Sequence, residues 1–457
     1  MKLFTADHIR NVAMAGHGGS GKTTLAEHLL YLAGHIDRIG SIEAGNTVSD
    51  FDPEEIRRKI SLSTSLLPIE WNDHKINLLD VPGFPDFIGE LYSALRVADA
   101  VLLVVPAQAE IEVGFENAWE LCEKYKLPRI LFVNKMERDN ADHTSLLQNL
   151  RATYGNRIVP VQVPIGSQTS FQGVVDVIHN KAYLGKDRDT TASEVPSDLQ
   201  AEVQQVREML MEAAAEADDA LLEKYLNGEA LTDEELVHGF HAGVRTGAIV
   251  PVLYGSAQAG IGLTPLLQAL IELAPSPVEV PAPKAEDPRT GTQVEVSCDP
   301  NAPLCAFVFK TTADPYVGKL TYFRVYAGTI RADSQVYNAN KERDERIGQL
   351  FFMRGKNQEA TSEIRAGDIG VVAKLQETAT GHTRQRQMCI RDRGMPCATA
   401  IARCFYRPLN FPTPSTPSRL CPKPKRTRIG WDLPLPACRR RIRPCAHDAT
   451  QKRGKPC

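Results

Sequence analysis

The sequence lacks the features that mark membrane-spanning, secreted and disulfide-rich proteins. Its longest apolar run, Ala100–Ala107, is eight residues, far short of the roughly 18 needed to cross a bilayer. Asp7, His8 and Arg10 interrupt any apolar core of a secretory signal near the N-terminus. Residues 1–392 hold only four of the ten cysteines and no Cys-x-x-Cys pair, so their thiols are expected to be reduced and packed. We therefore expect a cytoplasmic protein with no membrane partner.

Charge is divided unevenly along the chain. The 53 Lys and Arg nearly balance the 56 Asp and Glu, but residues 393–457 hold 15 basic and two acidic side chains. Residues 1–392 are left with 38 basic and 54 acidic ones, a balance of −16. An acidic body does not bind nucleic acid through its overall charge, so any such contact has to come from local basic patches.

Hydrophobic patterning predicts a doubly wound α/β domain in the first part of the chain. Short apolar runs alternate with longer amphipathic stretches up to about Ala274, which is typical of buried parallel strands joined by crossover helices. The runs expected to be strands are Asn11–Ala15, Lys75–Asp80, Ala100–Val105, Arg129–Val133 and Ala248–Leu253. A charged interruption between Pro160 and Gly247, with a helix over about Leu199–Leu226, predicts an inserted α+β subdomain before the last strand.

Proline separates this domain from a predicted β-barrel. The run Ala274–Pro277 and the prolines up to Pro288 cannot continue a helix and predict a semi-rigid linker. Short β-rich runs with glycines between them follow; they are Leu304–Lys310, Leu320–Tyr326, Ser334–Tyr337, Arg346–Phe352 and Ile369–Ala373. We expect a nucleotide-binding domain over residues 1–277 with its insertion at about 160–247, a linker over 278–296, a small β-barrel domain over 297–383 and an irregular basic tail over 384–457.

A phosphate-binding loop follows the first predicted strand. The run Gly16-His17-Gly18-Gly19-Ser20-Gly21-Lys22-Thr23 fits the pattern GxxxxGK[ST] and precedes a helical run, Leu25–Leu32. Glycines let main-chain N–H groups turn toward phosphates, and the helix N-terminus adds positive potential. Lys22 would neutralise the β- and γ-phosphates, Thr23 would bind Mg²⁺, and Thr24 belongs to the same nucleotide-binding set. The strand and helix around the run disfavour the alternative of an ordinary glycine-rich turn.

A second segment completes the predicted phosphate end of the site. Asp80-Val81-Pro82-Gly83 ends a predicted strand beside the phosphate loop. Asp80 could hold Mg²⁺ through water, and the Gly83 N–H could meet a γ-phosphate and sense its loss. A DxxG run alone is often only a turn, and its place after a phosphate loop is what makes it informative.

Two loops at further strand ends predict which base is bound. In Asn134-Lys135-Met136-Glu137, the Glu137 carboxylate can accept from guanine N1–H and the 2-amino group, which adenine does not offer, while Asn134 and the Lys135 stem hold the ring. Ser256 and Ala257, after the last predicted strand, would present a main-chain N–H to the guanine oxygen. The order of these motifs indicates GTP or GDP. A P-loop ATPase or kinase stays an alternative, and it predicts that ATP competes equally with GTP.

Together these motifs resemble those of the translational GTPases, and among them elongation factor G. The resemblance spans about residues 8–383 and is carried by Asn134–Arg138 with Ala141–Asp142, Gly255–Ala257, Ala274–Pro277, Asp314–Leu320, Phe323–Thr329, Glu345–Gly348 and Arg365–Ile369. It implies a G domain with an insertion, a β-barrel that contacts the ribosome, and three further domains that are not recognisable here.

The resemblance also implies an activity and its partners. It implies hydrolysis of GTP with Mg²⁺ on the ribosome to promote translocation, by a monomer that contacts rRNA and ribosomal proteins directly and tRNA and mRNA indirectly. An alternative is a GTP-dependent ribosome-binding module, or a ribosome-protection-type paralogue, that hydrolyses little GTP.

Three positions depart from the family's pattern. Phe84 stands where DTPGH has a His that orients the attacking water, and a phenyl ring offers that water no donor or acceptor. With Lys22 and Gly83 it forms the predicted catalytic set, so we expect slow hydrolysis or the use of another group; alternatively, Phe84 only packs and another residue does the chemistry. Glu137 replaces the usual Asp, and its extra methylene should weaken guanine binding without admitting adenine.

The third departure lies in the segment Gly45–Leu62, called the first switch below. Arg58-Lys59-Ile60-Ser61-Leu62 replaces the family's RGITI. Ser61 then stands in for the Thr that binds Mg²⁺, so the predicted metal set is Thr23, Ser61 and Asp80; the alternative is that Ser61 is plain surface. The polar stretch before it suits a loop that becomes ordered with the γ-phosphate.

The resemblance ends after Thr383, and the basic tail is too rich in Pro and Arg to bury a core. We favour a shifted reading frame or an assembly junction near Gln387–Arg393 over a genuine RNA-binding arm, in which Lys423–Arg428 and Arg439–Arg441 would contact phosphates. The tail's cysteines lack paired ligand spacing, which argues against zinc.

Overall fold

The computed structural model describes most of the chain up to residue 378. The described residues are 1–229, 231–281, 284–286, 293–314, 317–338, 343–375, 378, 387–389 and 405–406. The prediction of an irregular basic tail therefore falls outside the described residues, except for two short strands, β23 (Gln387–Cys389) and β24 (Phe405–Tyr406).

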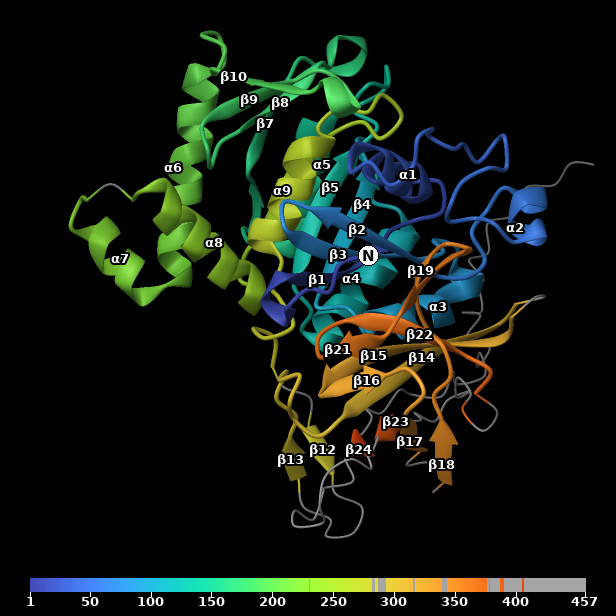
Figure 1. Cartoon of the computed structure of the whole chain (residues 1–457). Helices are drawn as coiled ribbons and strands as arrows, with labels where there is room; N and C mark the ends of the chain where they lie inside the picture. The colour runs from blue at the N-terminus through green and yellow to red at the C-terminus, as the bar shows by residue number, and fades with distance from the viewer. Residues whose placement is uncertain are drawn as a thin grey trace, which may run out of the picture. The chain divides into compact units, whose positions relative to one another are not determined.

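A seven-stranded sheet, in the order β2-β3-β1-β4-β5-β11-β6, forms the centre of the first region (Figure 1). Its strands are β1 (Ile9–Ala15), β2 (Ser65–Trp71), β3 (His74–Asp80), β4 (Ala100–Pro106), β5 (Arg129–Asn134), β6 (Ile158–Pro160) and β11 (Val250–Tyr254). All neighbours pair in parallel except β2 and β3. Every residue of β1, β4 and β5 is buried, which is why β4 is apolar throughout and why β1 and β5 contain runs of apolar residues.

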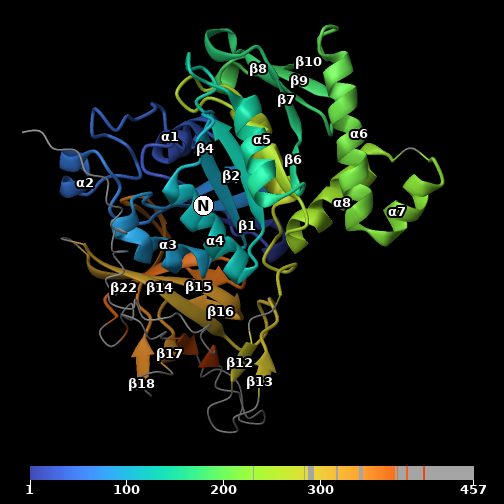
Figure 2. The same ribbon diagram turned by 180° about the vertical axis from the view of Figure 1, so that it is seen from behind.

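Helices cover both faces of this sheet, so the predicted doubly wound α/β fold is confirmed. α1 (Lys22–Leu32) and α9 (Leu263–Leu273) lie on the face turned toward the viewer in Figure 1. α3 (Ile88–Leu95), α4 (Val113–Tyr125) and α5 (His143–Tyr154) lie on the opposite face, seen in Figure 2. Nonpolar side chains from each layer form a separate core against the sheet.

The insertion lies between β6 and β11. It combines an antiparallel sheet with three helices; the strands are β7 (Gln162–Ile165), β8 (Gly173–Asp176), β9 (Lys181–Leu184) and β10 (Thr191–Ser193), and the helices are α6 (Gln200–Ala217), α7 (Asp219–Leu226) and α8 (Asp233–Thr246). The single helix predicted up to Leu226 is divided at Asp218, whose side chain accepts hydrogen bonds from the N–H groups of Ala220 and Leu221 and so caps α7.

The second region is β-rich and antiparallel. Its main sheet has the order β18-β17-β23-β14-β15-β22-β19-β20. Its strands are β14 (Cys305–Asp314), β15 (Gly318–Ala327), β17 (Gln335–Asn338), β18 (Arg343–Arg346), β19 (Leu350–Arg354), β20 (Asn357–Thr361) and β22 (Ile369–Ala373); β12 (Lys284–Glu286) pairs with β13 (Gln293–Glu295), and β16 (Thr329–Arg331) with β21 (Glu363–Arg365). The run predicted as one strand over Arg346–Phe352 is divided between β18 and β19.

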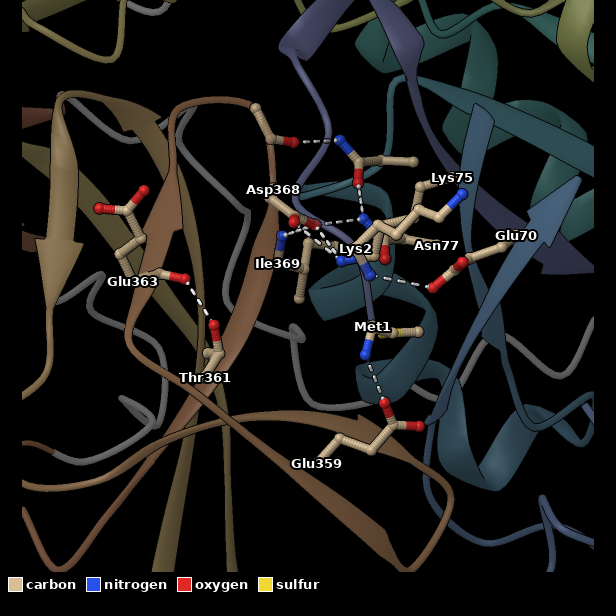
Figure 3. Close-up of polar contacts among 12 residues, drawn as sticks. Met1, Lys2, Glu70, Lys75, Asn77, Glu359, Thr361, Glu363, Asp368 and Ile369 are labelled. Carbon is tan, nitrogen blue, oxygen red and sulfur yellow. Dashed lines mark hydrogen bonds and ion pairs between the residues drawn. The ribbon is translucent and has the colours of Figure 1, made fainter. Parts of the chain in front are cut away.

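Buried ionic contacts join the two regions (Figure 3). The Lys75 ammonium, on β3, donates to both carboxylate oxygens of Asp368 at 2.8 Å, and the Asn77 amide donates to the same carboxylate at 2.9 Å. Lys75 is fully buried and lies 3.6 Å from the centroid of the Phe352 ring. A second buried pair joins Arg324 to Asp99 at 2.7 Å.

The β-rich region also contacts the start of the strand that follows the first switch. Lys310, on β14, donates to the main-chain oxygen of Thr64 and lies 3.8 Å from the Glu90 carboxylate of α3. Gly355, in the turn between β19 and β20, donates its N–H to Leu66 on β2 at 3.0 Å. Among the described residues, no helix is both long and apolar enough to span a membrane.

Candidate functional site

The predicted phosphate loop connects the end of β1 to the start of α1. Gly16, Gly19 and Gly21 have φ angles of 145°, 83° and 97°, which residues with a Cβ rarely adopt. A Cβ on Gly16 would lie 2.3 Å from the Val104 oxygen, and one on Gly21 would lie 2.4 Å from the Asn134 amide nitrogen. The loop therefore needs glycine at both positions. The helix begins at Lys22, three residues earlier than the apolar periodicity predicted.

Lys22 is held inside the loop. Its ammonium donates to the main-chain oxygens of Gly16 at 3.0 Å and His17 at 2.8 Å. Burial lowers the pKa of Lys22 to about 8, although the nearby Asp80 carboxylate opposes this shift. A buried cation among loop amides at a helix N-terminus is an arrangement that binds phosphate.

The three residues predicted to hold a metal lie together beside the loop. The Thr23 hydroxyl donates to Asp80 Oδ2 at 2.8 Å and lies 3.3 Å from the Ser61 hydroxyl. Ser49, which sequence reasoning missed, donates to the same Asp80 oxygen at 2.5 Å. The structure thus places Ser61 next to Thr23 rather than on a remote surface.

Unsatisfied carboxylate oxygens at this point fit a hard divalent cation. Asp80 Oδ1 and both carboxylate oxygens of Asp50 are buried without a hydrogen-bond partner. Burial raises the pKa of Asp80, and burial together with the Asp80 charge raises that of Asp50 to about 7, although the nearby Ser61 hydroxyl opposes the second shift. Carboxylates and hydroxyls are the ligands that Mg²⁺ prefers. The described residues contain no cluster of three or more His, Cys, Asp or Glu arranged for a metal, so hydroxyl oxygens have to complete the set.

Gly83 and Phe84 close the loop from the other side. A Cβ on Gly83 would lie 2.5 Å from the Lys22 ammonium and 2.6 Å from the Gly18 nitrogen, so only glycine lets this main chain approach the loop. A Cβ on Gly18 would lie 2.8 Å from the Phe84 ring, which is 37 % exposed. Phe84 therefore covers the loop at the pocket wall and is not a core residue.

The predicted base-reading residues meet at the opposite end. The Asn134 amide donates to the Ser20 oxygen at 2.9 Å and accepts from the Ala257 N–H at 2.8 Å. The Lys135 ammonium donates to the Gly19 oxygen at 2.6 Å. Glu137 has a buried carboxylate oxygen without a partner. Buried acceptors are normally hydrogen-bonded, so this oxygen is free to accept from the N–H groups of a bound guanine.

Two main-chain donors predicted to meet guanine are bonded within the protein. The Ser256 N–H donates to Ile261 at 3.0 Å, and the Ala257 N–H is bonded to Asn134. Guanine would have to replace the Asn134 contact in order to use the Ala257 donor.

A single pocket joins these groups. Its wall includes Lys22, Thr23, Ser61, Phe84 and Glu137. Residues outside the predicted set also line it, among them Asp50, Lys59 and Gln258. Of the predicted set, Gly16, His17, Ser20, Asp80 and Ser256 are not part of the wall. Ser20, Asp80 and Ser256 are almost fully buried behind it and shape the loops that form it.

Comparison with known proteins agrees with this geometry. Residues 7–276 match the family model of the elongation factor Tu GTP-binding domain, and residues 303–384 match the model of elongation factor G domain 2. A crystal structure of a protein from Thermus thermophilus is 35 % identical, has a TM-score of 0.74 and covers 85 % of this chain. This chain spans 55 % of the length of that protein. The predicted resemblance is confirmed: the chain belongs to the elongation factor GTP-binding family and is a translational GTPase of the elongation-factor-G-like type.

Proposed function

We propose that this chain is the nucleotide-binding and second-domain part of a factor that hydrolyses GTP on the ribosome and promotes translocation. The observation that carries the proposal is one pocket that joins Lys22 and the phosphate loop to a Glu137 carboxylate with one buried, unpartnered oxygen. The proposed domains cover residues 1–277, with an insertion at about 160–247, and residues 297–383. The family matches over residues 7–276 and 303–384 support these bounds.

The residues of the pocket have separate proposed roles in binding phosphate, guanine and Mg²⁺. Lys22, the loop amides and Thr24 would bind the phosphates, while Asn134, Lys135 and Glu137 would select guanine. Thr23, Ser61, Asp80 and Asp50 would hold Mg²⁺, which neutralises charge on the β- and γ-phosphates when bound. Gly83 would donate its N–H to the γ-phosphate, since it already lies against Lys22 and Gly18.

Phe84 supports a low intrinsic rate. Its ring covers Gly18 at the pocket wall but cannot orient water or accept its proton. The same observation favours a second candidate function, a GTP-dependent ribosome-binding module that turns over slowly. The match to elongation factor G domain 2 supports ribosomal RNA and proteins as direct partners in either case.

The test is binding and turnover by the purified chain. We expect a fluorescent GTP analogue to bind in the presence of MgCl₂ and to be displaced by GTP and GDP but not by ATP at equal concentration. Release of phosphate that ribosomes strongly stimulate supports the translocase-type enzyme, and GTP-dependent ribosome binding without release supports the module. Equal competition by ATP would refute the guanine assignment.

A further inference from the structure

Lys59 occupies a main-chain conformation that favours glycine. It is the residue at which α2 (Pro53–Arg58) ends, with φ 56° and ψ 37° in the left-handed region. A side chain other than Asn, Asp or Gly is uncommon there, because its Cβ crowds the neighbouring main chain. Strained residues of this kind often mark functional positions. RGITI, the pattern that the chain resembles, has glycine at this point.

The Lys59 side chain belongs to the wall of the nucleotide pocket. It lines the pocket beside Ser61 and Asp50, with the phosphate loop also in the wall. Its ammonium forms an ion pair with Glu43, and both side chains are exposed, at 48 % and 79 %. An exposed pair of this kind contributes little stability, so the ammonium can change partners at small cost.

The main chain fixes Lys59 relative to the predicted metal residues. Glu55, which is buried in α2, accepts hydrogen bonds from the N–H groups of Leu62 at 3.0 Å and Ser63 at 3.2 Å. This ties both ends of the stretch from Lys59 to Ser63 to the helix. Ser61 lies 3.3 Å from Thr23, so Lys59 is held near the phosphate end of the pocket rather than the guanine end.

We propose that Lys59 is a second phosphate-binding cation, which exchanges Glu43 for an oxygen of the β- or γ-phosphate and faces Lys22 across the nucleotide. This inference rests on the proposed function and deepens it. Two buried carboxylates, Asp50 and Asp80, lie at this end, so a triphosphate gains from positive charge beyond that of Lys22 and the metal. A lysine in the first switch supplies that charge from within the chain.

The experiment compares four variants with the wild-type chain, using fluorescent GTP and GDP analogues in MgCl₂. Lys59→Gly removes the charge and relaxes the main chain, Lys59→Met removes only the charge, and Lys59→Arg keeps it. Lys126→Gly is the matched control, because Lys126 ends α4 with φ 53° and ψ 41°, is exposed and does not line the pocket.

We expect Lys59→Gly and Lys59→Met to bind GTP about tenfold more weakly, the value of one charge-assisted hydrogen bond. Lys59→Arg should stay within about threefold of wild type, because it keeps the charge on a side chain of similar reach. Lys126→Gly should bind as wild type does. Neither glycine variant should lower the melting temperature, since glycine relieves strain at both sites.

Two results would overturn the inference. One is unchanged GTP affinity in Lys59→Met, and the other is an equal loss in Lys59→Met and Lys59→Arg, which would show that shape rather than charge matters. If the wild-type chain binds GTP, either result leaves the proposed function intact. A wild-type chain that binds no guanine nucleotide refutes the proposed function itself.

Discussion

Replacing Asp368 with Asn tests whether the buried Lys75–Asp368 pair holds the two regions together. Lys75 is fully buried, and both of its hydrogen bonds to Asp368 measure 2.8 Å. The substitution keeps the shape of the side chain but leaves the Lys75 charge without a counter-ion. Removing one partner of a buried pair costs about 3–5 kcal/mol. We expect the lower end, about 3 kcal/mol, because Asn retains one acceptor and the Phe352 ring stays 3.6 Å away.

The loss of stability should also depend on pH in a defined direction. Burial lowers the pKa of Lys75, and Asp368 opposes this shift. Without Asp368 the pKa falls further, so the folded variant binds fewer protons than the unfolded chain. Stability then rises with pH, and the deficit relative to wild type should shrink as the pH is raised toward the ordinary pKa of lysine, about 10.4, because the neutral amine becomes accessible. Urea unfolding followed by circular dichroism at several pH values measures both effects.

A matched substitution and a double variant control this prediction. Asp333→Asn breaks an exposed pair with Arg346, whose atoms lie 3.2 Å apart, and should cost less than about 1 kcal/mol. Combining Lys75→Met with Asp368→Leu removes both charges and should recover most of the loss. A cost below about 1 kcal/mol for Asp368→Asn, or a double variant as unstable as the single one, would refute the reasoning.

Three further predictions concern catalysis, specificity and the insertion. Phe84→His should raise phosphate release at least about tenfold, because it adds a group that can orient water; an unchanged rate would mean that Phe84 only packs. Glu137→Asp should tighten GDP binding by up to about tenfold without any gain in ATP binding, as measured by nucleotide displacement, and tighter ATP binding would contradict the role of the carboxylate. His179→Asn should destabilise the chain by about 1–2 kcal/mol at low pH, because hydrogen bonds to Asp176 and Glu272 raise the pKa of His179 from 6.5 to about 10. That stabilisation is complete below about pH 6.5 and lost toward pH 10. Urea unfolding of wild type and variant at several pH values measures it, and a loss of unfolding free energy that does not change with pH would argue against the ion pairs.

Buried parallel strands and phosphate-loop chemistry could be predicted from sequence because both depend on local patterns. β4 was predicted almost to the residue, since a strand buried on both faces has to be apolar throughout. β2 was not predicted. It lies at the edge of the sheet and contains Pro68, which edge strands tolerate; its turn to β3 uses Asn72 and Asp73 with positive φ, a hairpin signal that was present in the sequence.

The missed residues of the pocket depend on the path of a long loop rather than on local pattern. Ser49 and Asp50 reach Asp80 from 30 or more positions away, and no periodicity in the polar first switch predicts that contact. Thr23 was predicted because its spacing within the loop fixes its place at the helix start. Lys59 was seen in the sequence only as a departure from RGITI, and its place in the pocket wall required the structure.

The contacts of Lys310 and Gly355 connect the β-rich region to the residues that follow Ser61. Thr64 is bonded both to Lys310 and, through its N–H, to Glu90 at 2.7 Å, while Leu66 accepts from Gly355. These anchors begin within three residues of Ser61, so if Ser61 moves when the proposed γ-phosphate leaves, β14 and the β19–β20 turn would move with it. A spectroscopic label on either element would then report the chemical state of the nucleotide at a distance. Under the proposed function, the β-rich region would carry that movement to its ribosomal contacts.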